Sequence, residues 1–191
     1  MSEEQRACLG SVYRIAADFL KERGLTEAVM SQLPPESRRL IERPPFSFGW
    51  QDYKPLEELE KTLYARSPEL PADLGRAAAQ HFSGTIVAPV IKLAATLFGS
   101  TPESIFGNLD RFFSIVIRGF SFRYEPASPL NGRVIVTIKG GPVHPALFQQ
   151  LRGNLHVTYE VCTTTGTVGE PEVLRSDDAG AEVAYDVEWT G

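Results

Sequence analysis

The hydrophobic repeat changes from a helical period to a strand period in the second half of the chain. Between residues 105 and 116 apolar side chains recur every three or four positions, which predicts one helix. Beyond it they alternate with polar ones in four segments, residues 120–124, 134–138, 155–161 and 183–189. Such alternation is typical of a strand with one buried and one solvated face. We therefore expect about four strands, with Asn131 and Gly132 in a type I′ hairpin turn between the first two.

Helical patterns dominate the first hundred residues. Apolar side chains keep a helical spacing in residues 2–24, 26–33, 36–43, 54–66 and 72–98, and residues 145–151 add a short helix. Pro89 should kink or break the longest of these. We predict an α+β fold in which N-terminal helices pack on one face of a C-terminal antiparallel sheet of about four strands. No internal repeat or low-complexity linker interrupts residues 1–191, so we expect a single globular domain.

The charge balance argues against nucleic acid as a partner. The 191 residues carry a formal net charge of −5, whereas binding to a phosphate backbone needs a basic surface. Most of the excess acid lies near the C-terminus, where Glu182, Asp186 and Glu188 should point outward from the last strand. We expect this acidic edge of the sheet to bind a basic protein partner.

Signals for export and for membrane insertion are missing from the sequence. The first residues are acidic and no apolar run follows them, so no signal peptide is predicted. No apolar stretch is long enough to cross a bilayer. Cys8 and Cys162 form neither a disulfide framework nor a metal-binding pair. We therefore expect a cytoplasmic protein.

No catalytic or metal-binding motif stands out. The three histidines, His81, His144 and His156, are not spaced as a helical metal pair. Neither a nucleophile elbow nor a phosphate-binding glycine loop occurs. We expect His144 at the start of a helix, His156 on a solvated strand face, and no enzymatic activity, metal or cofactor.

Aromatic residues cluster where the helices should meet the sheet. The cluster includes Phe106, Phe113 and Phe122, and His81 lies on a helix that could approach it. Aromatic side chains dominate the burial of ordinary cores, so a filled core is the favoured interpretation. The alternative is an apolar pocket between helices and sheet, formed by these four residues, that holds a small hydrophobic ligand.

Five segments stand in a characteristic order along nearly the whole chain: GSVYRIAADFLKERG, LPPESRRLIERP, Trp50 with Tyr53, LGRAAAQHFSGTIV and AYDVEW. Together they resemble a paralogous family of myxobacteria, a domain of unknown function. The layout of helices followed by a sheet is also similar to the superfamily of haem-dependent nitric-oxide sensor domains, vinyl-reductase-type ligand domains and TRAPP vesicle-tethering subunits. This second resemblance is one of layout, and it implies a fold rather than a function.

The haem-dependent members of that superfamily use a helical histidine and a Tyr-x-Ser-x-Arg motif that binds the haem propionates. Neither Tyr13, which Arg14 and Ile15 follow, nor Tyr124 begins such a motif, and the other tyrosines do not either. The resemblance therefore gives no support for haem. TRAPP subunits are dimeric scaffolds. For this chain we expect a homodimer for a separate reason, because a sheet of four short strands leaves two edges that invite pairing with another chain.

These observations favour a non-catalytic interaction or regulatory module that binds a protein partner. The candidate partner-binding residues are Trp50, in an aromatic loop at residues 46–50, and the acids Glu182, Asp186 and Glu188. A homodimer should form through the helices or the aromatic loop, because an apolar loop needs cover. The alternative function is the sensing of a small hydrophobic ligand.

Overall fold

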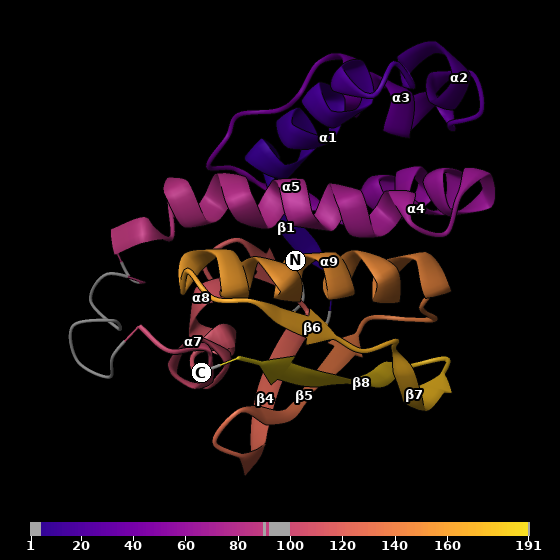
Figure 1. The fold of residues 1–191 in the computed structure, drawn as a ribbon. Helices are drawn as coiled ribbons and strands as arrows, with labels where there is room; N and C mark the ends of the chain where they lie inside the picture. The colour runs from indigo at the N-terminus through magenta and orange to yellow at the C-terminus, as the bar shows by residue number, and fades with distance from the viewer. Residues whose placement is uncertain (1–4, 90, 92–99, 191) are drawn as a thin grey trace.

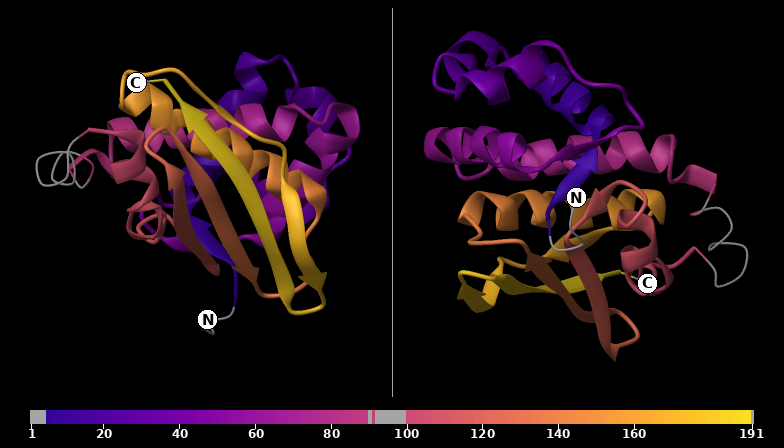
Figure 2. Two further views of the ribbon diagram at one scale, coloured as in Figure 1. Left: turned by 60° about the horizontal axis from the view of Figure 1, so that its bottom comes forward. Right: turned by 180° about the vertical axis from the view of Figure 1, so that it is seen from behind.

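A five-stranded antiparallel sheet forms the C-terminal part of the molecule. The computed structural model describes residues 5–89, 91 and 100–190. The strand order is β4-β5-β8-β6, and β7 also pairs with β8. The strands are β4 (Phe120–Ser128), β5 (Asn131–Lys139), β6 (Gly166–Val168), β7 (Glu172–Asp177) and β8 (Gly180–Trp189). The helices of the described residues lie on one face of this sheet (Figures 1 and 2), so the predicted α+β fold is confirmed.

Alternation in the long strands follows the two faces of the sheet. Val134, Val136 and Ile138 on β5 are fully buried, as are Val183 and Tyr185 on β8. Their neighbours along each strand point away from the helices. Trp189, the last residue of β8, is 8% exposed, so the C-terminal strand is part of the core, as its alternating pattern predicts.

The helices form layers above the sheet. In Figure 1, α9 lies on the sheet, α4 and α5 cover α9, and α1 to α3 lie farthest from the five-stranded sheet. The helices are α1 (Gly10–Glu22), α2 (Thr26–Met30), α3 (Pro35–Glu42), α4 (Lys54–Arg66), α5 (Leu70–Gly84), α7 (Pro102–Phe106), α8 (Leu109–Phe113) and α9 (Pro145–Val161). None of those in the described part of the chain combines the length and hydropathy needed to cross a bilayer.

Two glycines let α5 and α9 pack backbone to backbone. A Cβ atom on Gly153 would lie 1.9 Å from the carbonyl oxygen of Ala72, and one on Gly75 would lie 2.0 Å from that of Gln150. Only glycine tolerates such an approach. The two helices therefore form a rigid pair, and α9 presents its remaining faces to the sheet and to the segment from α7 to β3.

A small second sheet connects the N-terminus to the middle of the chain. It has the order β2-β1-β3, with β1 (Ala7–Leu9), β2 (Trp50–Asp52) and β3 (Ile117–Arg118). Cys8 therefore lies in a strand, and α1 begins at Gly10, later than the sequence pattern predicted. Residues 2–4, where the helix expected at residues 2–24 would begin, lie outside the described residues.

The expected strand at residues 155–161 is wrong, because this segment is the second half of α9. Leu155, Val157, Thr158 and Tyr159 are all at most 4% exposed. They surround the helix because α9 is covered by α5 on one side and by the sheet on the other. A helix that is buried on opposite faces has no apolar stripe, and its sequence can mimic strand alternation. His156, placed on a strand face by that pattern, lies instead on this helix, half-buried.

The hairpin between β4 and β5 turns earlier than predicted. Ser128 pairs with Asn131, so Pro129 and Leu130 form the turn. Gly132 does not adopt the positive φ that a type I′ turn requires. Its lack of a side chain serves packing, because a Cβ atom there would lie 2.5 Å from the ring of Tyr124.

The remaining differences concern element boundaries. The single helix expected at residues 105–116 is divided into α7 and α8 at Gly107 and Asn108. Two strands that the sequence pattern did not predict, β6 and β7, lie between α9 and β8. The long helix expected at residues 72–98 ends as α5 at Gly84, before Pro89. Val90 and residues 92–98 of that prediction lie outside the described residues. Helix α7 begins before residue 105, because the side chain of Thr101 caps it and accepts a hydrogen bond from the Ser104 amide at 3.2 Å.

Candidate functional site

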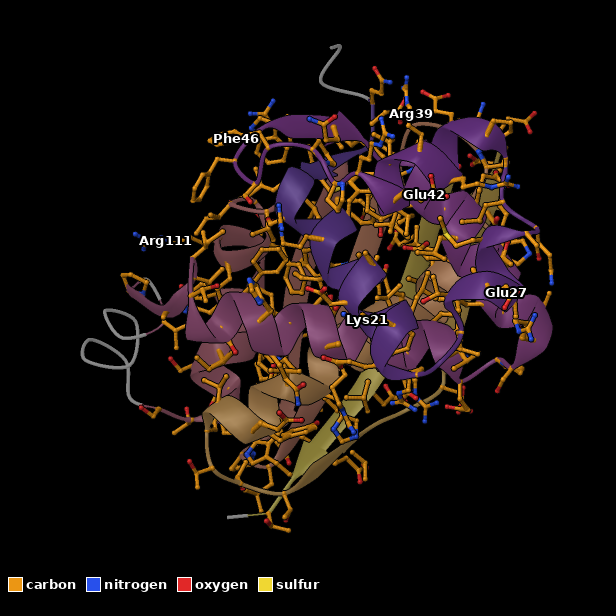
Figure 3. All side chains as sticks on the ribbon, turned by 90° about the horizontal axis from the view of Figure 1, so that it is seen from above. Lys21, Glu27, Arg39, Glu42, Phe46 and Arg111 are labelled. Carbon is orange, nitrogen blue, oxygen red and sulfur yellow. The ribbon has the colours of Figure 1, made fainter. Side chains whose placement is uncertain are left out.

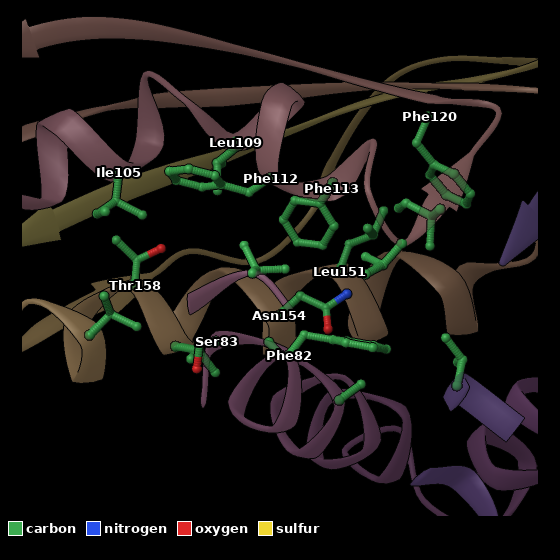
Figure 4. A pocket seen from close by; sticks show the side chains of 18 of the residues that line it. Phe82, Ser83, Ile105, Leu109, Phe112, Phe113, Phe120, Leu151, Asn154 and Thr158 are labelled. Atoms are coloured by element: carbon green, nitrogen blue, oxygen red, sulfur yellow. The ribbon is translucent and has the colours of Figure 1, made fainter. Parts of the chain in front are cut away.

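A cavity of about 100 Å³ lies where α5 and α9 face the segment from α7 to β3. Figure 4 shows Phe82 and Ser83 entering it from α5, Leu151, Asn154 and Thr158 from α9, and Ile105, Leu109, Phe112 and Phe113 from the α7–α8 side. Most of its lining side chains are aliphatic or aromatic. The glycine-mediated packing of α5 on α9 fixes one wall, and the break between α7 and α8 turns Leu109 and Phe112 toward that wall.

Three of the polar lining residues lie on one face of α9. Gln150, Asn154 and Thr158 all line the cavity and are spaced four residues apart, so they share a helix face. In Figure 4 the carboxamide of Asn154 extends toward the cavity. Within the described part of the chain no hydrogen bond to that carboxamide is formed. The cavity is thus apolar with a narrow polar stripe.

Tyr53 connects this stripe to a buried carboxyl group. Its hydroxyl lies 2.8 Å from Oε1 of Gln150 and 2.9 Å from Oε1 of Glu60. The exposed fractions are 3% for Tyr53, 4% for Gln150 and 1% for Glu60. Tyr53 precedes α4 directly after β2, and Glu60 lies two turns into α4, so both side chains point into the layer between α4 and α9.

No cation of the described residues forms an ion pair with Glu60. Arg6 lies nearby, but its Nε pairs with Glu57 at 2.7 Å and its other nitrogens donate to the carbonyls of Gly141 and Pro142. Among the described residues no group bonds the second carboxyl oxygen of Glu60, Oε2. Burial raises the pKa of Glu60 from its ordinary value of 4.5 to about 8, although the Tyr53 hydrogen bond opposes this rise.

The thiol and phenol beside this network are also held neutral. Burial raises the pKa of the Cys8 thiol, and Cys8 is fully buried on β1. Burial also raises the pKa of Tyr13, whose hydroxyl donates to the Asp52 carbonyl oxygen at 2.6 Å. Cys8 is therefore protected from reaction, because the thiolate is the nucleophilic form.

The structure brings one of the four expected pocket residues into the cavity. Phe113 lines it, and Phe122 stacks on Phe113 with ring centroids 4.4 Å apart without lining the cavity itself. Phe106 packs elsewhere in the core, against aromatic rings that include Trp189 at 5.9 Å. His81 is exposed on α5 and contacts the neighbouring ring of Phe82 edge-on. The helical period placed His81 near the apolar run, but its own side chain faces outward.

The candidate partner-binding residues do not form one surface. Trp50 is half-buried in β2, with the Arg118 guanidinium 3.9 Å above its ring. Asp186 and Glu188 are exposed on β8, and Glu182 is half-buried on the same strand. The expected acidic edge is wrong, because β8 lies inside the sheet, between β5 on one side and β6 and β7 on the other.

The aromatic loop is exposed at a different point than expected. Phe46 is 76% exposed and Phe48 63%, and their rings form an edge-on pair. Phe46 lies at the margin of the molecule in Figure 3. The backbone of this loop is fixed, because the amides of Gly10 and Ser11 at the start of α1 donate to the carbonyls of Gly49 and Ser47.

Sequence reasoning missed the polar side of the cavity. Glu60 carried a signal, since a charged residue interrupts the apolar stripe of residues 54–66. Gln150 and Asn154 carried none, because polar residues on a helix are ordinarily solvated. In the described residues no three histidine, cysteine, aspartate or glutamate side chains group as a metal ion would require. His144 caps α9 as expected, with Nδ1 accepting from the Ala146 amide at 3.1 Å.

No model of a known protein family and no curated protein matches this chain. Its fold is similar to solved structures of H-NOX proteins. An Fe(II) unliganded H-NOX protein from K. algicida is 16% identical with a TM-score of 0.67, and the match covers 96% of this chain and 97% of that one. An oxygen-binding H-NOX domain related to soluble guanylate cyclases is 10% identical with a TM-score of 0.64, covering 95% of each chain. At these identities the similarity establishes the fold alone, and the resemblance to the myxobacterial family stays a prediction.

Proposed function

We propose that this chain is a sensing domain for a small, uncharged, apolar ligand that binds in the cavity between α5, α9 and the α7–β3 segment. The observation that carries the proposal is the cavity itself, about 100 Å³ in volume and lined mainly by aliphatic and aromatic side chains. An apolar cavity of roughly 150 Å³ in another protein stays dry and binds benzene or xenon. A ligand of a few heavy atoms, up to a small ring, therefore suits this volume.

The fold supports ligand sensing more than protein binding. One of its structural neighbours is an oxygen complex of an H-NOX domain, so the same architecture holds a small molecule elsewhere. The protein-binding interpretation has weaker support, because Trp50 is covered by Arg118 and the acids of β8 do not lie on an edge. We propose separately that two copies of the chain associate through Phe46 and Phe48, which are exposed.

Haem does not fit the residues that surround this cavity. Haem iron is held by histidine, cysteine, methionine or tyrosine, and Tyr53 is the one such residue among the described lining side chains. Its hydroxyl is already bonded to Glu60 and Gln150. Pockets for drug-sized ligands measure about 300–1,000 Å³, and a porphyrin needs a volume in that range. The proposed ligand therefore binds without haem.

The proposal is for a binding domain rather than an enzyme. Tyr53 is also the one titratable side chain among the described residues that line the cavity, and burial raises its pKa. A general acid or base works best when its pKa lies near the operating pH, which this phenol does not satisfy. Binding that shifts the packing of α7 and α8 against α9 would be sufficient for a sensor.

Xenon tests the cavity directly, because it is apolar and needs no hydrogen bond. The ¹²⁹Xe chemical shift should change saturably with protein concentration. Ala78 lines the cavity and is 7% exposed, so Ala78→Leu should fill the space and remove the specific shift. Ala65→Leu, at an exposed position on α4, is the matched control and should bind xenon as the parent does. An equal xenon response in the parent and in Ala78→Leu would refute the proposal.

A further inference from the structure

At one end of the cavity, a single hydroxyl group lies between two hydrogen-bond acceptors. The Tyr53 hydroxyl is within hydrogen-bonding distance of two acceptors, Oε1 of Glu60 at 2.9 Å and Oε1 of Gln150 at 2.8 Å. A phenol donates one hydrogen bond, so it cannot satisfy both oxygens. Either Glu60 is protonated and donates to Tyr53, or the Gln150 carboxamide is reversed and its NH₂ group donates to Tyr53.

The surroundings of Glu60 favour the protonated acid. Glu57 and Lys61 share its helix, Arg6 and Cys8 approach from the β1 side, and Asp52 lies on β2. Of the two cations, Arg6 pairs with Glu57, and Lys61 lies 2.9 Å from Glu58.

A buried carboxylate with one hydrogen bond and no cation is unfavourable, because its charge is left without solvation. Below the raised pKa, about 8, Glu60 therefore donates to Tyr53, and Tyr53 donates to Oε1 of Gln150.

This direction of donation fixes the polarity of the cavity. With Oε1 of Gln150 accepting from Tyr53, the NH₂ group of the same carboxamide is left to the cavity that Gln150 lines. Within the described residues that nitrogen donates no hydrogen bond. We propose that the ligand is a small apolar molecule carrying one hydrogen-bond acceptor, such as a ketone oxygen, which Gln150 binds. The inference rests on the proposed function. Glu60 acts as a positioning residue through Tyr53.

Three five-membered rings of similar size separate the polarity of the site from its shape. Cyclopentanone offers an acceptor, pyrrole an N–H donor, and cyclopentane neither. We would titrate each into the full chain near pH 6 and follow binding by two-dimensional NMR. Each affinity is then expressed relative to cyclopentane on the same variant, so the cost of removing each ring from water cancels between variants.

Gln150→Met removes the carboxamide while nearly preserving side-chain volume. The relative affinity for cyclopentanone should fall about three- to tenfold in this variant, the range for one neutral hydrogen bond. The relative affinity for pyrrole should not fall with it. An unchanged preference for cyclopentanone would overturn the inference.

Glu60→Gln gives a readout that a merely structural role would not move. Its NH₂ group can donate to Tyr53 as the protonated acid does, so the preference for cyclopentanone should persist from pH 6 to pH 9. The parent should lose that preference near pH 9, because ionised Glu60 accepts the hydrogen bond of the Tyr53 hydroxyl. The Gln150 carboxamide then reverses, so that its NH₂ group donates to Tyr53. Pyrrole should then gain affinity relative to cyclopentanone.

The outcomes distinguish the inference from the function on which it rests. If all three rings bind saturably but the parent shows the same preference at both pH values, the assigned polarity is wrong and the apolar site stands. If Glu60→Gln loses the preference near pH 6, the donor role of Glu60 is wrong. If no ring binds and xenon does not bind either, the proposed function itself is refuted.

Discussion

Replacing Glu60 with glutamine should make the protein more stable at neutral and alkaline pH. Glu60 is 1% exposed. In the part of the chain that the structure describes, it forms no ion pair and is hydrogen-bonded through one of its two oxygens. Glutamine has nearly the same shape as the protonated acid and can donate to Tyr53 in the same way. The substitution therefore keeps the packing and removes the proton equilibrium.

The magnitude follows from the shift in the pKa of Glu60 on folding. In the unfolded chain the carboxyl ionises near 4.5, whereas in the folded protein it ionises near 8. Between these values the folded state binds one more proton than the unfolded state, so the free energy of unfolding falls as pH rises. The contribution of Glu60 to the free energy of unfolding is fully present below about pH 4.5 and is lost by about pH 8. At about 1.4 kcal/mol per pKa unit, the loss amounts to about 5 kcal/mol.

Urea unfolding followed by circular dichroism, repeated from pH 5 to pH 8.5, measures this difference. Glu60→Gln should match the parent within about 1 kcal/mol near pH 5 and exceed it by about 4–5 kcal/mol above pH 8. Burial lowers the pKa values of His144 and His156 from 6.5. The contribution of these two histidines to the free energy of unfolding therefore rises with pH, opposite to that of Glu60. Because both histidines are present in both proteins, their contribution cancels in the difference.

Glu58→Gln is the matched control. Glu58 lies on the same helix, but its side chain is 31% exposed and paired with Lys61. Its difference from the parent should stay within about 1 kcal/mol across the range, as for an exposed ion pair. A constant difference between Glu60→Gln and the parent at all pH values would refute the assignment of a neutral, buried Glu60.

Three further predictions concern the core, haem and assembly. Trp189→Ala should lower the free energy of unfolding by about 3–5 kcal/mol, because Trp189 is buried against Phe106; an unchanged melting temperature would contradict this. Titration with haem should give no stable Soret band. A stable band that His81→Ala abolished would show that the protein does bind haem. Sedimentation at micromolar concentration should detect a homodimer that Phe46→Ser weakens more than Trp50→Ala does, since the Phe46 side chain is 76% exposed. A strict monomer would remove that proposal.

The cavity shows the limit of sequence reasoning most clearly. The aromatic cluster correctly marked the region where helices meet sheet, and Phe113 does line the space. Phe106 fits the same period and fills the core instead. Whether an apolar side chain fills a volume or borders one depends on how close the surrounding elements approach. Here Gly75 and Gly153 set that approach from a different pair of helices.

The sequence by itself determined those elements that have one face in water. The alternation of β4, β5 and β8 and the stripe of α1 are legible because solvent selects polar residues at every position that faces it. The tertiary structure alone decided that α9 continues through residues 152–161, where burial on opposite faces leaves no solvent-imposed period. It also decided the chain from Glu60 through Tyr53 to Gln150, which joins residues up to 97 positions apart. The periodicity of a local sequence reflects which positions face water, whereas contacts between distant segments produce no periodicity.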